Sequence, residues 1–278
     1  MVLLLGVGEV SMASCSLGSI LQGTRLAKQM EHLWASRHLL IRTCTEGSDQ
    51  TALSAEEEAD LRTFHESKII DVCTHFKFDL QVLTAAILLH KRFYLKRSML
   101  QGKDPKHIML ACIFLGTKVG NLHLEASFIT GKVAGSDPKV VLELEFHVLS
   151  NVGFNLDFPP LDAVFRGLFL FFGSLLPQVQ VQRVEEQIFP AVIHRILLSD
   201  LLLAYPVKKV ALAVTLHWIE KEFGNEVLEL AVDKVINHVP DFERELMYQI
   251  IKHLDSFKLQ TQQKCKETME KLRIYCGN

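Results

Sequence analysis

The amino-acid sequence predicts an all-α protein built from two tandem repeats of five helices, with further helices flanking them. Its 278 residues include only 15 glycines and 8 prolines, and apolar residues recur with the period of a helix instead of alternating as in strands. The segment 108–115 (Ile-Met-Leu-Ala-Cys-Ile-Phe-Leu) also aligns with 210–217 (Val-Ala-Leu-Ala-Val-Thr-Leu-His), which lies 102 residues further on. A duplication of this length indicates two similar domains rather than a solenoid of short units.

Helix-start signals define the first repeat. Ser54 and Glu57 have the spacing of a capping box, in which each side chain caps the backbone of the other. Asp104 and Asp137 each stand directly before a proline, which is the pattern of an N-cap followed by a proline in the first turn. We expect the five helices at 54–76, 79–95, 108–118, 123–133 and 140–152.

A proline corner at 158–160 separates the two repeats, because proline interrupts helices. The second repeat has its expected helices at 161–175, 179–199, 206–222, 225–237 and 241–257. Further helices are expected at 24–42, before a polar linker, and at 259–276. The expected division is a disordered tail (1–23), an N-terminal helix with its linker (24–53), a first repeat (54–157), a second repeat (158–257) and a C-terminal helix (258–278).

The third helix of the first repeat is apolar on every side over residues 108–116, so we expect its neighbours to surround it. Cys73 and Cys112 lie within apolar helical segments, and the six cysteines include no CxxC pair. Buried free thiols in a reducing compartment are therefore expected.

Two charged residues, Lys118 and Glu145, stand where the helical pattern calls for apolar residues. Residues three, four and seven positions apart share a helix face, so the neighbours of Lys118 include Phe114 and Leu115, and those of Glu145 include Val148. A buried charge is costly unless something pairs with it. Two such charges at the edge of one core indicate a surface that receives a partner, or else an internal ion pair.

Composition excludes several classes of function. The net charge is −2, with no basic stripe, which argues against a direct nucleic-acid ligand. The longest apolar stretch, 167–176, has ten residues against the ~20 that span a bilayer, and Glu9 interrupts the apolar N-terminal run, so we expect neither a membrane span nor a signal peptide. Neither HExxH nor a Cys/His set with zinc spacing occurs, so no metal or other cofactor is expected.

Several segments resemble the cyclin family, and within it the cyclin H branch. His90-Lys-Arg-Phe-Tyr-Leu95 is similar to a run found in transcriptional cyclins, and 104–118 looks like the third helix of their box. In the second half, 194–200 and Ala204-Tyr-Pro206 also resemble cyclin H. The resemblance covers roughly residues 54–257 and implies two cyclin boxes.

This resemblance implies a regulatory subunit without catalytic activity of its own, which binds and activates a cyclin-dependent protein kinase. A box lysine and glutamate of cyclins hold the backbone of the kinase's helix-C segment, and their counterparts here are Lys118 and Glu145. The apolar residues around them that would receive a kinase side chain are Leu115, Val119, Leu149 and Leu156. The partners implied are the kinase of transcription factor IIH, which acts on RNA polymerase II, and a RING-type assembly factor; the location implied is the nucleus.

Other interpretations stay open. A cyclin C-like subunit of the mediator kinase module shares the Lys-Arg-Phe-Tyr run. A transcription factor IIB-like protein also has two cyclin folds, but it would need a zinc ribbon and a basic face. An all-helical terpenoid synthase would need a DDxxD metal site, whereas the acidic run 56–58 is consecutive and spreads around its helix. Glu220 is the second-repeat counterpart of Lys118, so the first repeat alone is expected to bind the kinase.

Overall fold

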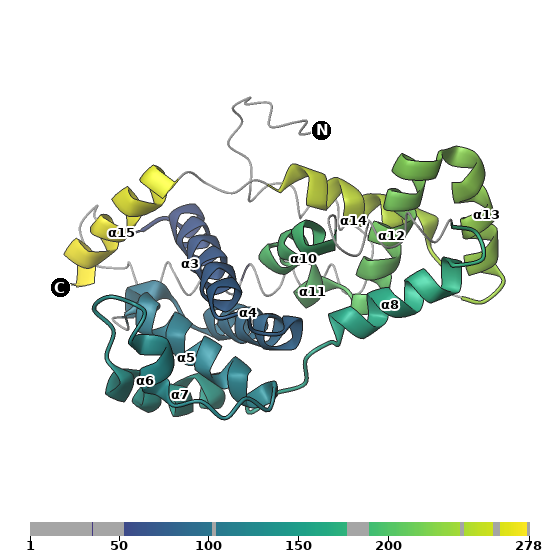
Figure 1. Cartoon of the computed structure of the whole chain (residues 1–278). Coiled ribbons are helices and arrows are strands. Elements are labelled where there is room, and N and C mark those ends of the chain that lie inside the picture. Colours follow the sequence, from purple (N-terminus) through teal and green to yellow (C-terminus); the bar gives the residue numbers. More distant parts are fainter. Residues whose placement is uncertain are drawn as a thin grey trace.

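The computed structural model describes residue 35 and residues 53–101, 104–176, 189–239, 242–257 and 262–276, and every regular element within these ranges is helical. The prediction of an all-α fold is confirmed. Figure 1 shows α3 to α7 gathered in one half of the molecule and α8, α12, α13 and α14 in the other, with α10 and α11 between them. The expected tail at 1–23, the helix at 24–42 (apart from Ala35, which is helical) and residues 179–188 lie outside the described residues.

The first repeat follows the start signals in its sequence. Its elements are α3 (Ala55–His75), α4 (Leu80–Lys96), the 3-10 turn η1 (Met99–Gln101), α5 (Pro105–Val119), α6 (Ala126–Thr130) and α7 (Pro138–Asn151). Both hydrogen bonds of the Ser54–Glu57 capping box are present, and the Asp104 and Asp137 carboxylates each accept a backbone N–H of the first turn. The expected helix at 123–133 is wrong in length, because the chain stays extended up to Glu125 and a turn follows at Gly131.

The second repeat contains α8 (Leu161–Phe172), α10 (Phe189–Leu198), α11 (Leu201–Ala204), α12 (Val207–Phe223), α13 (Asn225–Ile236) and α14 (Arg244–Ser256). Helix α8 ends three residues earlier than expected, at a turn that begins with Gly173. The short α11 was not expected from the sequence. Helices α5 and α12 begin at residues 105 and 207, which is the 102-residue spacing of the sequence duplication. None of the described helices is both long and apolar enough to cross a bilayer.

Helix α5 is the centre of the first repeat. Every residue from Ile108 to Thr117 is buried, which confirms that this helix is surrounded. Gly116 permits the tight packing of α5 on α4, because a Cβ at this position would lie 2.8 Å from the Val82 carbonyl oxygen. Cys73 and Cys112 are buried free thiols, also as expected.

A histidine ties the N-terminal ends of α5 and α7 together. His107 Nδ1 lies 2.6 Å from Asp104 Oδ2, and the Asp137 backbone N–H donates to His107 Nε2 at 3.2 Å. Since Nε2 accepts, Nδ1 carries the proton and donates it to the Asp104 carboxylate. This bridge helps to set the register of α5 against α7, and therefore the separation of Lys118, in the last turn of α5, from Glu145, in the middle of α7.

The C-terminal helix α15 (Gln262–Cys276) packs on α3 of the first repeat. Lys264 Nζ lies 2.9 Å from Asp60 Oδ2, and Lys271 Nζ lies 2.9 Å from both carboxylate oxygens of Glu57. Burial raises the pKa of Glu57, but its hydrogen bonds to Ser54 and the nearby Lys271 outweigh this and hold the pKa below its ordinary value. The capping residue of α3 is therefore held by a helix more than 200 residues further along the chain.

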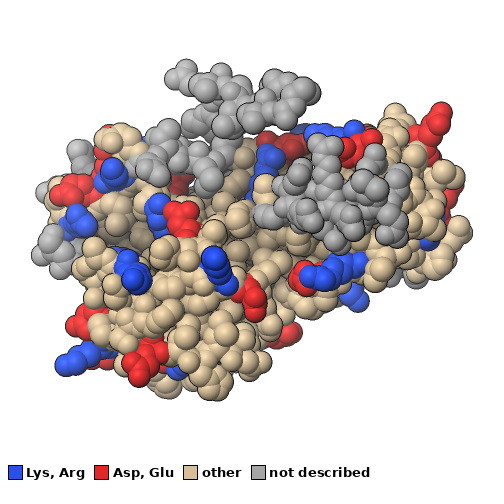
Figure 2. Space-filling model, viewed as in Figure 1, with Lys and Arg blue, Asp and Glu red and all other residues tan. Residues whose placement is uncertain are grey.

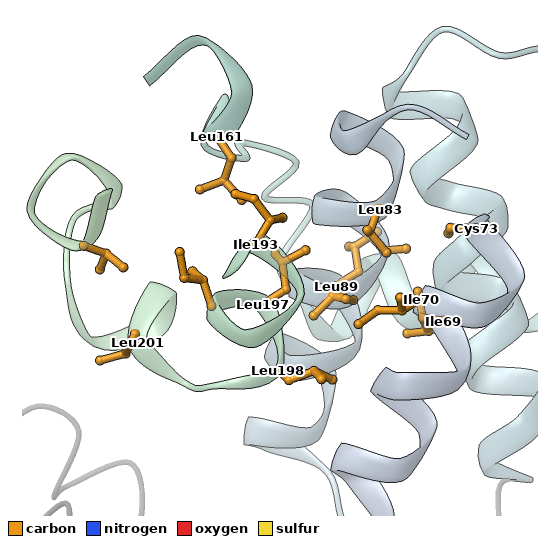
Figure 3. Close-up of a cluster of buried hydrophobic side chains, with 14 of the residues drawn as sticks. Ile69, Ile70, Cys73, Leu83, Leu89, Leu161, Ile193, Leu197, Leu198 and Leu201 are labelled. Atoms are coloured by element: carbon orange, nitrogen blue, oxygen red, sulfur yellow. The ribbon is translucent and has the colours of Figure 1, made fainter. Parts of the chain in front are cut away.

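The two repeats share an apolar core. Figure 3 shows Ile69 and Ile70 of α3 and Leu89 of α4 beside Ile193 and Leu197 of α10. All five side chains are buried. Burying apolar area contributes about 25 cal/mol per Å², so this cluster is a main source of cohesion between the halves.

An ionic network lies within the same interface. Lys91 Nζ is 2.6 Å from Glu66 Oε2, 2.9 Å from Asp200 Oδ1 and 3.0 Å from the Leu198 carbonyl oxygen. Arg62 Nη2 also lies 3.1 Å from Asp200 Oδ2. Burial raises the pKa of Glu66, but Lys91, His90 and Arg62 outweigh this and hold the pKa below its ordinary value. We call Arg62, Glu66, Lys91 and Asp200 the ionic joint, because they connect α3 and α4 to the turn between α10 and α11.

Lys91→Met is expected to lower the free energy of unfolding by about 3–5 kcal/mol, because it leaves the buried Glu66 carboxylate and the part-buried Asp200 carboxylate without their ammonium partner. Urea unfolding of the purified chain measures the loss. Lys68→Met is the matched control, since the Lys68–Asp71 pair at 2.7 Å is exposed and its removal should cost less than about 1 kcal/mol. Equal losses in the two variants would contradict a special role for Lys91.

A buried histidine beside this network predicts acid sensitivity. The His65 Nδ1–H donates to the Leu61 carbonyl at 2.8 Å, and its ring stacks near His90. Burial and, to a smaller extent, the neighbouring His90 lower the pKa of His65 to about 4, against weaker opposing effects of Leu61, Asp104 and Glu66. His65 is therefore protonated near pH 6.5 in the unfolded chain, but only near pH 4 in the folded chain.

The stabilising contribution of neutral His65 is fully present above pH 6.5 and falls as the pH drops towards 4. At pH 5 we expect a loss of about 2 kcal/mol from this residue. Urea unfolding at pH 7.5 and pH 5 measures it. His65→Asn, which keeps a donor near Leu61, should reduce the pH dependence; an unchanged pH dependence would assign the effect to other groups.

Candidate partner-binding site

Lys118 and Glu145 meet at the surface of the first repeat. Lys118 stands in the last turn of α5 and Glu145 in the middle of α7. Lys118 Nζ lies 2.5 Å from Glu145 Oε1 and 4.5 Å from the centre of the Phe114 ring. The apolar ring below and the carboxylate beside it hold the ammonium in one place.

The pair is partly exposed, which corrects the expectation of two buried charges at the edge of a core. The side chain of Lys118 is 47% exposed and that of Glu145 is 19% exposed. An exposed ion pair contributes only about 0–1 kcal/mol to stability. The internal pair that the sequence left open is therefore formed, and it is weak enough for a partner to replace.

The four apolar residues predicted to surround this pair differ in exposure. Leu115 is buried and supports the site from below, Val119 and Leu149 are half-buried, and Leu156 is 42% exposed. A partner has direct access to Leu156 and to parts of Val119 and Leu149. The contact of these residues with a kinase remains a prediction.

Three apolar side chains that the sequence analysis did not select extend this surface. Leu142 and Phe146 of α7 are 50% and 67% exposed, and Phe154 is 59% exposed. Residues 142, 145, 146 and 149 share one helix face, and the Phe146 and Phe154 rings meet edge to face at 6.0 Å. We call Leu142, Phe146, Leu149, Phe154 and Leu156 the apolar strip. The signal for it was that α7 carries apolar residues beyond the single face needed to cover a core.

The backbone after α7 holds Phe154 outward. Gly153 N–H donates to the Ser150 carbonyl at 3.2 Å, and Phe154 N–H donates to the Leu149 carbonyl at 2.9 Å. These two bonds define a Schellman motif, which needs a left-handed residue after the helix, here Gly153 with φ 68°. Phe154 also has a positive φ of 56°, an unfavourable conformation for a bulky residue.

The Lys-Arg-Phe-Tyr run of α4 supports the site from the other side. Arg92 donates from its two terminal nitrogens to the Asn155 carbonyl at 3.1 Å and the Asp157 carbonyl at 2.9 Å. Its guanidinium also lies 4.9 Å from the centre of the Phe158 ring. Arg92 thereby fixes the connection between the repeats that carries Leu156.

The chemistry available here suits a peptide backbone. Lys118 offers only donors and Glu145 only acceptors, so together they match a segment that presents both carbonyl and amide groups. No cluster of three or more metal-binding side chains was found among the residues that the structure describes. On the face shown in Figure 2, basic and acidic side chains are interspersed between wide uncharged areas.

The chain is similar to known proteins in sequence and in fold. Residues 30–157 match the family model of the cyclin N-terminal domain. The chain is 32% identical to Cyclin-H1-1 of Arabidopsis thaliana over 58% of its own length, and 31% identical to Cyclin CCL1 of Saccharomyces cerevisiae over 59%. These matches span 48% and 42% of the two relatives, so the chain covers about half of their length.

Solved structures show the same fold over most of the chain. A chain of the CAK complex of Chaetomium thermophilum bound to ATP-γ-S matches with a TM-score of 0.73 and 18% identity, over 93% of this chain and 88% of that one. A chain of the yeast TFIIK (Kin28/Ccl1/Tfb3) complex matches with a TM-score of 0.61 and 24% identity, over 80% and 92%. Residues 30–157 are thus similar to the N-terminal domain of cyclins, and the fold over most of the chain is similar to that of these solved structures. The relatives to which it is similar include proteins named cyclin H.

Phe154→Gly is expected to stabilise the isolated chain by about 1 kcal/mol, because glycine removes the cost of a left-handed conformation. Urea unfolding measures the change. Phe154→Ala removes the same ring but keeps a Cβ, so it should give no such gain. If Phe154→Gly were no more stable than Phe154→Ala, the strain at this residue would be disproved.

Proposed function

We propose that this chain is a cyclin H-like regulatory subunit that binds and activates a cyclin-dependent protein kinase. The observation that carries the proposal is the exposed Lys118–Glu145 pair beside the apolar strip, at the C-terminal end of a fully surrounded α5. The family match supports it. The division into boxes at 54–157 and 158–257 belongs to the same proposal, with the first box as the kinase-binding one.

The site acts by selecting one arrangement of its partner. Lys118 donates to carbonyl oxygens and Glu145 accepts from N–H groups of the helix-C segment, while the apolar strip receives a kinase side chain. In active kinases the helix-C glutamate pairs with the ATP-binding lysine. A subunit that binds this arrangement better than the inactive one shifts the population towards it, without contributing a catalytic group itself.

The kinase of transcription factor IIH, a serine/threonine kinase acting on RNA polymerase II and on other kinases, is the proposed partner. Two matching folds come from complexes named CAK and TFIIK (Kin28/Ccl1/Tfb3). A RING-type assembly factor would be the third member, and the nucleus the location. The relatives named cyclin H favour this assignment over a cyclin C-like mediator subunit.

Lys118→Ala/Glu145→Ala should weaken kinase binding by about 2–5 kcal/mol, because each truncation leaves a partner group desolvated and unpaired. This corresponds to a loss of affinity of roughly 30-fold to several thousand-fold. Titration calorimetry with the purified kinase measures it. Lys209→Ala/Glu243→Ala is the control, since this pair, at 2.7 Å, is also a lysine–glutamate contact at the surface but lies in the second repeat.

Recovery of the tagged chain from its own cells, read by mass spectrometry, identifies the kinase. Subunits of transcription factor IIH that are lost in the double variant would support the proposal, whereas mediator subunits would favour the cyclin C-like function. Recovery of no kinase would leave the fold intact and remove the function. A large fall in the melting temperature of the isolated double variant would assign the pair to stability instead.

A further inference from the structure

The second repeat carries a recess at the position that corresponds to the candidate site of the first. At the 102-residue spacing, Lys118 corresponds to Glu220 of α12 and Glu145 to Met247 of α14. Both Glu220 and Met247 line this recess, which has a volume of about 390 Å³ including its opening to solvent. In the described residues, the second repeat thus has an open groove at this position. Its edge carries Glu220 and Met247 in place of the lysine and glutamate of the first repeat.

The floor of this groove is apolar. It is formed by residues of α12, α13 and α14, together with Phe242, which precedes α14. The apolar lining residues are Ala213, Leu216, Leu228, Val232, Phe242, Met247 and Ile251. Much of its volume is open to solvent, so its enclosed part is well below the roughly 300–1,000 Å³ of ligand pockets and suits an apolar side chain better than a cofactor.

The rim of the groove presents a net negative charge to a binding partner. Arg244 is already engaged, because its two terminal nitrogens both donate to the Glu229 carboxylate. This hydrogen-bonded contact holds the pKa of Glu229 below its ordinary value. Glu220 is held more loosely, since its ionic contact among the described residues is with His217 Nδ1 at 3.5 Å. Its carboxylate is therefore the rim charge that a partner can still pair with.

We propose that this groove binds a short segment of a second protein, which inserts a large apolar side chain between α12 and α14 and places a lysine or arginine on Glu220. The apolar floor supplies affinity, and Glu220 supplies charge complementarity. Insertion of the apolar face of a short segment into a groove between helices is a common mode of peptide recognition. The proposal concerns a second site and does not rest on kinase binding by the first.

Charge reversal between the repeats keeps the two sites distinct. The first site offers an ammonium and a carboxylate, whereas the second has a carboxylate in place of Lys118 and an uncharged Met247 in place of Glu145. A segment with an acidic residue at this point would meet Glu220 and be repelled. Repulsion of the wrong partner is a usual source of specificity.

Selection of a random twelve-residue phage-displayed peptide library against the full chain tests the proposal. We expect recovered peptides that combine a large apolar residue with lysine or arginine and that bind at least tenfold more weakly to Glu220→Lys, as fluorescence anisotropy measures. Glu222→Lys is the matched control, with the same change of charge on the same helix at an exposed residue outside the recess lining, and it should bind normally. Replacing the basic residue of the peptide with glutamate should restore binding to Glu220→Lys.

Tyr248→Ala provides a second variant, because Tyr248 lines the groove and is 52% exposed, and it should also weaken these peptides. The proposal is overturned if no recovered peptide loses affinity for both Glu220→Lys and Tyr248→Ala, or if the peptides that do are not basic. Sedimentation of the chain alone measures whether it forms dimers. A concentration-dependent dimer that Glu220→Lys abolishes would overturn it too, because the occupant would then be a second copy.

Discussion

The arrangement of the two repeats depends on the ion pairs that the Lys91 ammonium group forms with Glu66 and Asp200. The ammonium lies between Glu66 of the first repeat and Asp200 of the second, and the side chain of Lys91 is only 1% exposed. The next residue, Arg92, holds the connection that carries Leu156 to the candidate site. Two adjacent side chains of α4 therefore link the interior joint between the repeats to the edge of the partner-binding surface.

Such a joint specifies geometry more than it adds stability. Bringing charges out of water costs several kcal/mol per ion, and the attraction between them roughly offsets this cost. The apolar cluster of Ile69, Ile70, Leu89, Ile193 and Leu197 supplies the cohesion (Figure 3). Apolar contacts alone would allow the two repeats to shift against each other. The hydrogen bonds of Lys91 to Glu66 and Asp200 form only when the two carboxylates are correctly placed. The two contributions together give the halves one defined orientation.

Local signals in the sequence were sufficient for most of the helices. The caps at Ser54, Asp104 and Asp137 fix where three helices begin, because capping depends on residues only two or three positions away. The partner of Lys91 was beyond such reasoning, since Asp200 is 109 residues distant. The exposure of Phe154 depends on its packing and on its backbone conformation. The helical period of apolar residues in the sequence predicts neither of them. The sequence therefore placed the charged pair on the correct helices, but it misjudged the burial of both charges and omitted most of the apolar strip.

The packing of α15 on α3 has a consequence for synthesis. Glu57 and Asp60 on α3 receive their lysine partners from residues 271 and 264, so this face stays uncovered until translation has advanced more than 200 residues beyond it. Domains generally fold as they leave the ribosome, and contacts this distant in sequence form slowly. The first repeat therefore leaves the ribosome before its contacts with α15 can form, and it is completed only when the last helix of the chain has been synthesised.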